Sequence, residues 1–415
     1  MKNNLLTVCS LAALVMTVSG CGIICPAKKC EVNNSEVKTQ LCQQKNIFIP
    51  KDIYAVEGEE CNIYFKNVFL AVNHNNFIFD VNCPAGKQEI KRWTFVPGKN
   101  DVNKNYKLTL KVYNCQEKLV AEDSATVHVV AADAAKGKKV SILMVGDSLT
   151  NATHYPARLH ELCNNSKAPV LHMTGSHSGS GRAVQAGGVA HEGYGGWRWT
   201  TFLTKYNPKP DAKARNAYAA SSKFLFPKAD GKSVEFSLKQ YLDKYNKGNM
   251  PDVITFQLGV NDVFHGTAEH LDNYIAGILA NADKLIAAFR KEAPNALFGV
   301  GFVTAGANQD AFGHNYKCSQ TSWGYYRNSF RLNQAMAKHF ANYPDKKVVM
   351  IPANTNLDCE NNFPARPAAI NARNPKVMYL KQNNGVHPAP AGYRQIGDTY
   401  YAWLKYQLSR SNSGK

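Results

Sequence analysis

The sequence predicts an α/β fold built on a parallel sheet with helices on both faces, preceded by a small antiparallel β-sandwich. Two observations carry this prediction. After Lys139, short apolar runs alternate with amphipathic stretches, which is typical of strands and helices that alternate in a parallel sheet. Before Ala131, short strand-like runs are separated by turn residues and no helical stretch lies between them, which favours a sandwich.

Length and charge limit the class of protein. A chain of 415 residues is too long for one ordinary core, so two folded units and an export sequence are expected. The formal net charge is +18, but the basic residues are scattered and form no stripe interleaved with aromatic residues. This pattern argues against nucleic-acid binding. A basic solvated surface, or a surface that attracts acidic polysaccharide or anionic lipid, remains open.

The first 46 residues indicate export. Residues 1–20 have the features of a signal peptide, with a basic start and an apolar stretch too short to span a bilayer. The stretch ends in Val18-Ser19-Gly20-Cys21, which resembles the lipobox of bacterial lipoproteins and implies that Cys21 is lipidated. The alternative is ordinary cleavage near Gly20, with Cys21 free or disulfide-bonded. Lipidation would anchor the protein in the bacterial cell envelope, at the outer membrane, through the tether 21–46.

The chain contains eleven cysteines, of which nine remain after Cys9 and Cys21 are set aside. No pair has the spacing of a zinc site, so an exported protein with this content is expected to form disulfides. Because nine is odd, one thiol is free or pairs elsewhere. The connectivity cannot be read from the sequence.

Residues 47–133 are expected to form the β-sandwich. Alternation is plainest over 107–113, and Pro97-Gly98 marks a turn. Residues 131–138 form a plausible linker. The expected strands lie at 47–49, 61–65, 76–81, 107–113 and 125–130.

Residues 138–415 are expected to form the α/β domain. Buried parallel strands read as continuous apolar runs, and such runs lie at 140–145, 253–258, 297–303 and 347–351. Between 271 and 289, and again between 393 and 408, apolar residues recur at intervals of three and four, which predicts amphipathic helices. The carboxyl ends of such strands are the usual place for a functional site.

The first of these strands ends in Gly146-Asp147-Ser148. A serine here projects beyond the sheet edge near a helix start, whose free N–H groups favour a developing negative charge. Alone, the motif is weak, because a serine that merely caps the helix fits equally well.

Three further blocks follow in chain order. A glycine-rich loop spans His191 to Trp197, and Gly259-Val260-Asn261-Asp262 follows the end of an apolar strand. Asn384-Gly385-Val386-His387-Pro388 stands just before the last helix, and Pro388 disfavours helical geometry at His387, which places this histidine on a loop.

Together the four blocks resemble the SGNH (GDSL-like) hydrolases over about residues 138–410. The resemblance implies a three-layer flavodoxin-like fold and esterase activity. It implies that Ser148 is the nucleophile and His387 the general base, with an oxyanion hole made by the N–H groups of Ser148 and Gly196 and the amide of Asn261. The assignment among Gly193, Gly195 and Gly196 is the least definite of these.

One position departs from the family pattern. The family usually has an aspartate three residues before the histidine, and this chain has Asn384. An amide can orient an imidazole but cannot offset its positive charge. We therefore expect a Ser–His dyad in which a backbone carbonyl or Asn384 orients the imidazole, and an inactivated relative is the alternative.

The resemblance also suggests the substrate. An exported esterase preceded by a β-sandwich domain looks like the SGNH members that remove acyl groups, mostly acetyl, from polysaccharides, so an acylated polysaccharide or a small ester is the expected substrate. No metal or other cofactor is expected. The alternatives are a lipase or thioesterase with the same chemistry, and a non-catalytic glycan-binding lipoprotein. Tyr194, Trp197 and Trp199 could stack on sugar rings or pack in the core.

Overall fold

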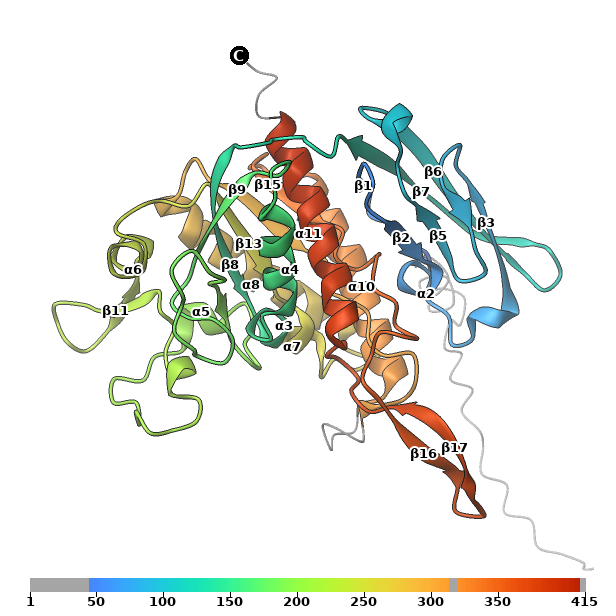
Figure 1. Cartoon of the computed structure of the whole chain (residues 1–415). Helices are drawn as coiled ribbons and strands as arrows, with labels where there is room; N and C mark the ends of the chain where they lie inside the picture. Colours follow the sequence, from blue (N-terminus) through green and yellow to red (C-terminus); the bar gives the residue numbers. More distant parts are fainter. Residues whose placement is uncertain (1–44, 313–319, 411–415) are drawn as a thin grey trace, which may run out of the picture. The chain divides into compact units, whose positions relative to one another are not determined.

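The computed structural model describes residues 45–312 and 320–410, and the chain from Lys45 onward forms one compact unit (Figure 1). The predicted signal peptide, Cys21 and all of the tether before Lys45 lie outside the described residues. None of the helices in the described part is both long and apolar enough to cross a membrane.

A parallel sheet forms the centre of the α/β part. Strand β8 (Lys139–Gly146) lies between β13 on one side and β9 on the other, and all neighbours run parallel. The strand order is β9-β8-β13-β14-β15, which is the flavodoxin-like order that the family resemblance implies. The other strands are β9 (Val170–Thr174), β13 (Val253–Gln257), β14 (Leu297–Gly301) and β15 (Val348–Ile351).

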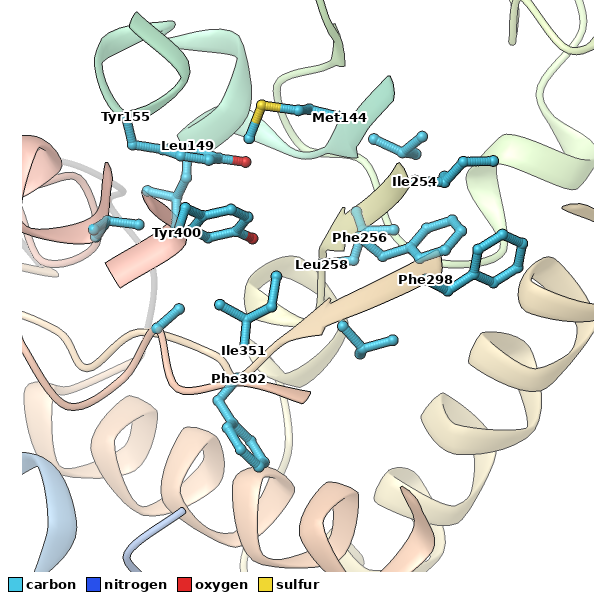
Figure 2. Packing of buried hydrophobic residues seen from close by; sticks show 14 of the residues in the cluster. Met144, Leu149, Tyr155, Ile254, Phe256, Leu258, Phe298, Phe302, Ile351 and Tyr400 are labelled. Atoms are coloured by element: carbon cyan, nitrogen blue, oxygen red, sulfur yellow. The ribbon is translucent and has the colours of Figure 1, made fainter. Parts of the chain in front are cut away.

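Helices cover both faces of this sheet. Phe256 of β13 packs against Phe289 of α8 (Leu271–Glu292), with ring centroids 5.3 Å apart. On β14, a Cβ added at Gly299 would lie 2.7 Å from Trp403 of α11 (Pro390–Arg410), so the opposite face carries α11. Helix α4 (His154–Cys163) packs beside α11, and α10 (Ser322–Ala341) packs beside α8. Figure 2 shows the apolar side chains that fill the space around the strands.

The predicted helical stripes are the buried faces of these helices. In α8 the buried residues include all six of the predicted stripe, namely Leu271, Ile275, Ile278, Ala282, Leu285 and Phe289. The same holds for α11, where Tyr393, Ile396, Tyr400, Trp403, Leu404 and Leu408 are buried. The α/β class and the parallel sheet are therefore confirmed.

The N-terminal β region, residues 47–130, contains two small sheets that share a hydrophobic cluster. One has the order β1-β7-β6-β3 and the other β2-β5-β4. The prediction of purely antiparallel pairing is wrong at one place, because β1 and β7 run parallel. A parallel pair needs a long crossover, and the chain between β1 and β7 supplies it. The strands are β1 (Asp52–Val56), β2 (Cys61–Tyr64), β3 (Phe77–Asn82), β4 (Lys87–Gln88), β5 (Arg92–Phe95), β6 (Asn105–Asn114) and β7 (Leu119–Val130).

The N-terminal β region packs tightly on the α/β part. Phe48 belongs to the main hydrophobic cluster, and its ring lies 5.2 Å from that of Phe302. Buried amides join the two parts as well: Asn62 Nδ2 donates to Asn356 Oδ1 at 2.9 Å, and Asn67 Nδ2 donates to the carbonyl oxygen of Leu357 at 2.8 Å. The type of secondary structure thus changes after residue 130, but the two parts on either side of this point pack against each other.

Five cysteines lie in the described residues, and all five are free thiols, so the predicted disulfides are absent from this part of the chain. Cys61, Cys163 and Cys359 are buried, and each belongs to a different hydrophobic cluster. Burial raises the pKa of each of these three thiols to about 12. Cys25, Cys30, Cys42 and Cys318 lie outside the described residues.

Candidate active site

Ser148 lies two residues after Gly146, the last residue of β8, at the strand end where it was predicted. It is the first residue of the short helix α3 (Ser148–Asn151), and Asp147 caps this helix by accepting the N–H of Leu149 at 2.9 Å. The Ser148 side chain is half-buried. The sharp turn from strand to helix therefore presents its hydroxyl at the sheet edge.

His387 lies 239 positions later and reaches the same point. Its Nε2 is 2.8 Å from Ser148 Oγ, which is a hydrogen bond in which a neutral imidazole can take the hydroxyl proton. Burial lowers the pKa of His387 below its ordinary value, which favours the neutral, basic form. The structure thus brings together the two residues predicted as nucleophile and base.

Asn384 holds the loop that carries His387. Its Oδ1 accepts the backbone N–H of Val386 at 3.1 Å and that of His387 at 2.9 Å. An aspartate could accept the same two hydrogen bonds. The asparagine thus holds the loop as an aspartate would, but without a negative charge. Asn384 therefore stabilises the backbone conformation of the histidine loop, a role that the sequence does not reveal.

The glycine block lies beside the nucleophile. Strand β10 (Glu192–Gly193) pairs with the end of β8, and Tyr194 N–H donates to the carbonyl oxygen of Gly146 at 3.0 Å. Gly193 must be glycine, because an added Cβ would lie 2.5 Å from the backbone nitrogen of Asn151. Gly196 has a φ of +77° and is exposed, and a Cβ added there would meet no atom of the described chain within 4 Å. Gly193 therefore allows close packing against the backbone of α3, whereas Gly196 allows the backbone conformation with positive φ.

Asn261 follows β13, the strand next to β8, and is the second residue of α7 (Val260–Val263). Its Nδ2 donates to the carbonyl oxygen of Trp197 at 3.0 Å, so the amide is tied to the residue after Gly196. One of its two amide hydrogens makes this contact, and the other can serve an oxyanion. No hydrogen bond among the described residues uses the backbone N–H of Ser148 or Gly196.

The sequence did not single out a buried polar cluster beneath the glycine loop. His191 Nδ1 accepts the N–H of Gly193 at 3.1 Å, and His177 Nε2 lies 3.0 Å from the carbonyl oxygen of Gly193. Both histidines are buried, and burial lowers the pKa of His191 to about 3. The two imidazoles thus contact both backbone polar groups of Gly193.

Glu192 completes this cluster. Its carboxylate is buried and accepts hydrogen bonds from the hydroxyls of Tyr194, Tyr241 and Ser176, the Tyr241 contact being 2.7 Å. A buried carboxylate is costly unless its lone pairs are satisfied, and here they are. Burial, and after it the charge of Glu192, raise the pKa of Tyr194 and of Tyr241 well above the ordinary value for tyrosine.

The carboxyls of Asp147 and Asp262 lie beside the site but face the backbone. Asp262 Oδ1 accepts the N–H of Trp199 at 3.2 Å, as Asp147 accepts that of Leu149. Burial raises the pKa of Asp147 to about 7 and that of Asp262 to about 6. Both therefore shape the loops around Ser148 and Asn261.

The three aromatic residues near the glycine loop are packed in the core. Tyr194, Trp197 and Trp199 are buried, and the rings of Tyr194 and Trp197 stack with centroids 4.1 Å apart. The packing interpretation therefore applies, and these rings do not form a platform for a sugar. Nowhere in residues 45–312 and 320–410 do three or more His, Cys, Asp or Glu gather as they would around a metal ion.

Comparison with known families agrees with this geometry. The profile of the GDSL-like lipase/acylhydrolase family matches residues 142–399, which is more than half of the chain. The chain belongs to this family. It is accordingly a carboxylic ester hydrolase. The match begins within β8 and ends within α11, so this GDSL-like acylhydrolase carries both Ser148 and His387 inside the family region.

Solved structures similar to this GDSL-like acylhydrolase include three esterases. They are the Clostridium thermocellum family 3 carbohydrate esterase (16% identity, TM-score 0.35, 67% of this chain and 100% of that chain), a carbohydrate acetylesterase family member from Sinorhizobium meliloti (16%, 0.35, 65% and 99%) and an acetyl xylan esterase (14%, 0.29, 64% and 100%). No curated protein matches the chain.

Proposed function

We propose that the protein is an exported, lipid-anchored serine esterase that removes acyl groups, acetyl above all, from polysaccharides. The observation that carries the catalytic part is the hydrogen bond of 2.8 Å between Ser148 Oγ and His387 Nε2. Gly195 and Gly196 are exposed, and a Cβ added at either would meet no described atom within 4 Å, which supports a bulky alcohol portion at this loop.

In the proposed mechanism, His387 takes the hydroxyl proton as Ser148 Oγ attacks the ester carbonyl carbon. The N–H groups of Ser148 and Gly196 and the amide of Asn261 stabilise the oxyanion of the tetrahedral intermediate. His387 then gives the proton to the leaving alcohol, and an acyl-enzyme remains on Ser148. Water, activated by the same imidazole, releases the acid and restores the serine.

The test compares nitrophenyl acetate with esters of longer acids, followed by acetylated xylan, pectin and sialylated glycans. We expect the acetyl ester to be the best small substrate and at least one acetylated glycan to release acetate. A preference for long acyl chains would assign the protein to the lipases or thioesterases, and glycan binding without turnover would assign it to non-catalytic binding proteins.

The catalytic pair is tested separately from the substrate. We expect Ser148→Ala and His387→Ala each to lower kcat by about 10⁴-fold or more, and the double variant to be little worse, because the two residues act as a unit. An active Ser148→Ala variant would contradict the mechanism. Asn261→Ala should lower kcat by about 10²–10³-fold, as removal of one oxyanion donor does.

The anchor rests on residues outside the described structure. We propose that Cys21 carries the lipid, because it follows the apolar segment in a lipobox-like context. Cys21→Ser should release the protein from membranes or block its processing, and a precursor that is never labelled by fatty acid would refute the anchor.

A further inference from the structure

A two-stranded hairpin extends from the α/β part and ends five residues before His387 in the sequence. Strands β16 (Ala365–Asn371) and β17 (Asn374–Gln382) pair only with each other among the described strands (Figure 1). From residue 365 to residue 381 every side chain except that of Ala368 is exposed. An isolated two-stranded ribbon is marginally stable in water and normally needs one face packed against other residues. The exposure of this hairpin shows that neither of its faces is packed in this way.

The base of the hairpin, in contrast, is fixed to the body. Gln309 N–H donates to Gln382 Oε1 at 2.7 Å, and Gln382 N–H donates to Gln309 Oε1 at 2.9 Å. Gln382 Nε2 also donates to the carbonyl oxygens of Cys359 and Glu360, at 2.9 and 2.8 Å. The ribbon is therefore held at one end and open along the rest of its length.

The exposed side chains of the hairpin are apolar and basic. Five large apolar residues are between 41% and 67% exposed: Ile370, Val377, Met378, Tyr379 and Leu380. Four residues are basic and none is acidic in 365–382; the basic ones are Arg366, Arg373, Lys376 and Lys381. Arg366 and Lys381 stand directly opposite each other in the register. Like charges in that position are destabilising, so an anion between them would stabilise the ribbon.

The composition of the hairpin selects among possible partners. A second hairpin would bring four cations against four, which disfavours self-association through this surface. For a polysaccharide the hairpin offers one aromatic ring, Tyr379, because its other large apolar side chains are aliphatic and provide no surface on which a sugar ring stacks. A lipid surface with anionic headgroups satisfies both features, because aliphatic side chains can enter the interface while basic ones meet phosphate.

We propose that the β16–β17 hairpin is a docking arm for an anionic lipid surface. Gln382 ends the arm five positions before His387, so docking holds the catalytic edge of the sheet near the membrane. The proposal depends neither on lipidation of Cys21 nor on the esterase chemistry, because its evidence is confined to the exposure, charge and register of the hairpin.

The test is hydrogen exchange on the full chain, read peptide by peptide, with phosphatidylcholine vesicles, with vesicles that also contain phosphatidylglycerol, and with polygalacturonate. We expect amides in 366–381 to exchange at least tenfold more slowly with the anionic vesicles and to be unchanged by the zwitterionic ones. Peptide resolution separates the hairpin from any binding by the N-terminus. Absence of protection by anionic vesicles would overturn the proposal, as would protection by polygalacturonate alone.

Variants sharpen the result. Met378→Asp combined with Leu380→Asp should abolish the protection, while Ile90→Asp, at a position that is 91% exposed in the N-terminal β region, should keep it. Lys376→Gln, a milder change, should require about fivefold more anionic lipid for the same protection. Circular dichroism and thermal denaturation report folding in each variant. Full protection in the double variant would refute docking through this arm. Protection of the unmodified protein without vesicles, increasing with protein concentration, would refute it as well, because it would indicate self-association.

Discussion

His387 lies half-buried beside Ser148, and the resulting change in its pKa has a direct kinetic consequence. Because burial lowers this pKa below its ordinary value of 6.5, the imidazole is mostly neutral, and therefore basic, at neutral pH. We expect kcat/KM for nitrophenyl acetate to fall along an acidic limb whose midpoint lies below 6.5. The pH profile of kcat/KM measures this, and an acidic limb with its midpoint above 6.5 would contradict it.

Asn384 gives a second prediction, because its side-chain oxygen accepts two backbone N–H groups of the histidine loop. Asn384→Ala removes the acceptor and should lower the free energy of unfolding by about 1–3 kcal/mol, together with kcat. Asn384→Asp keeps an acceptor oxygen, so we expect kcat within about threefold of the wild type. Denaturant titration and steady-state kinetics check both. A large gain in kcat for Asn384→Asp would show that a carboxylate acts on the ring itself.

Among single residues, the sequence predicts the site residues that lie in short motifs of consecutive residues. Ser148, Asn261 and His387 each lie in a short pattern that follows a strand or precedes a helix. His177, His191 and Glu192 could not be assigned in this way, because their partners are the two polar groups of Gly193 and the hydroxyls of distant residues such as Tyr241. Only the folded chain brings these groups together.

Among the elements, the glycine loop is the one whose position depends most on buried side chains. His191 accepts the Gly193 N–H, so His191→Ala should let the loop shift and lower kcat by about 10–100-fold, with a smaller effect on KM. His191→Asn can place an oxygen near the position of Nδ1 and should recover much of this loss. Kinetics of the two variants provide the check, and equal activity in the alanine variant and the wild type would exclude a positioning task.

The same histidine links stability to pH. Its pKa in the folded protein is about 3, whereas the unfolded chain has the ordinary value near 6.5. Between these values the unfolded state binds a proton that the folded state does not, so stability falls as pH falls from about 6.5 towards 3.

The elements themselves are predictable to different degrees. The strands of the parallel sheet and the helices α8 and α11 follow from apolar runs and stripes, because burial imposes those patterns. The parallel pairing of β1 with β7 does not follow, since it depends on a crossover between two sheets. The β16–β17 hairpin also escapes prediction, because the run Val377 to Leu380 is apolar yet exposed, and pattern rules assign such runs to the interior.

For the whole molecule, the contacts between the N-terminal β region and the α/β part decide how the chain tolerates truncation. From the sequence alone, a chain that begins near Ala134 is expected to keep its activity on small esters. The structure argues against this, because removal of Phe48, Asn62 and Asn67 would expose Phe302 and leave buried polar groups near Leu357 without partners. We expect the truncated chain to be insoluble or strongly destabilised, as measured by yield and denaturant titration. A soluble, active fragment would show that the two parts are independent.

The three buried thiols offer a way to watch the molecule open. Cys61, Cys163 and Cys359 lie in three separate hydrophobic clusters, and a thiol with a pKa of about 12 is nearly inert towards alkylating reagents at neutral pH. Each becomes reactive only when its own cluster is exposed to solvent. The three alkylation rates are therefore equal if the protein unfolds as a single cooperative body, and they differ if one region opens before the others.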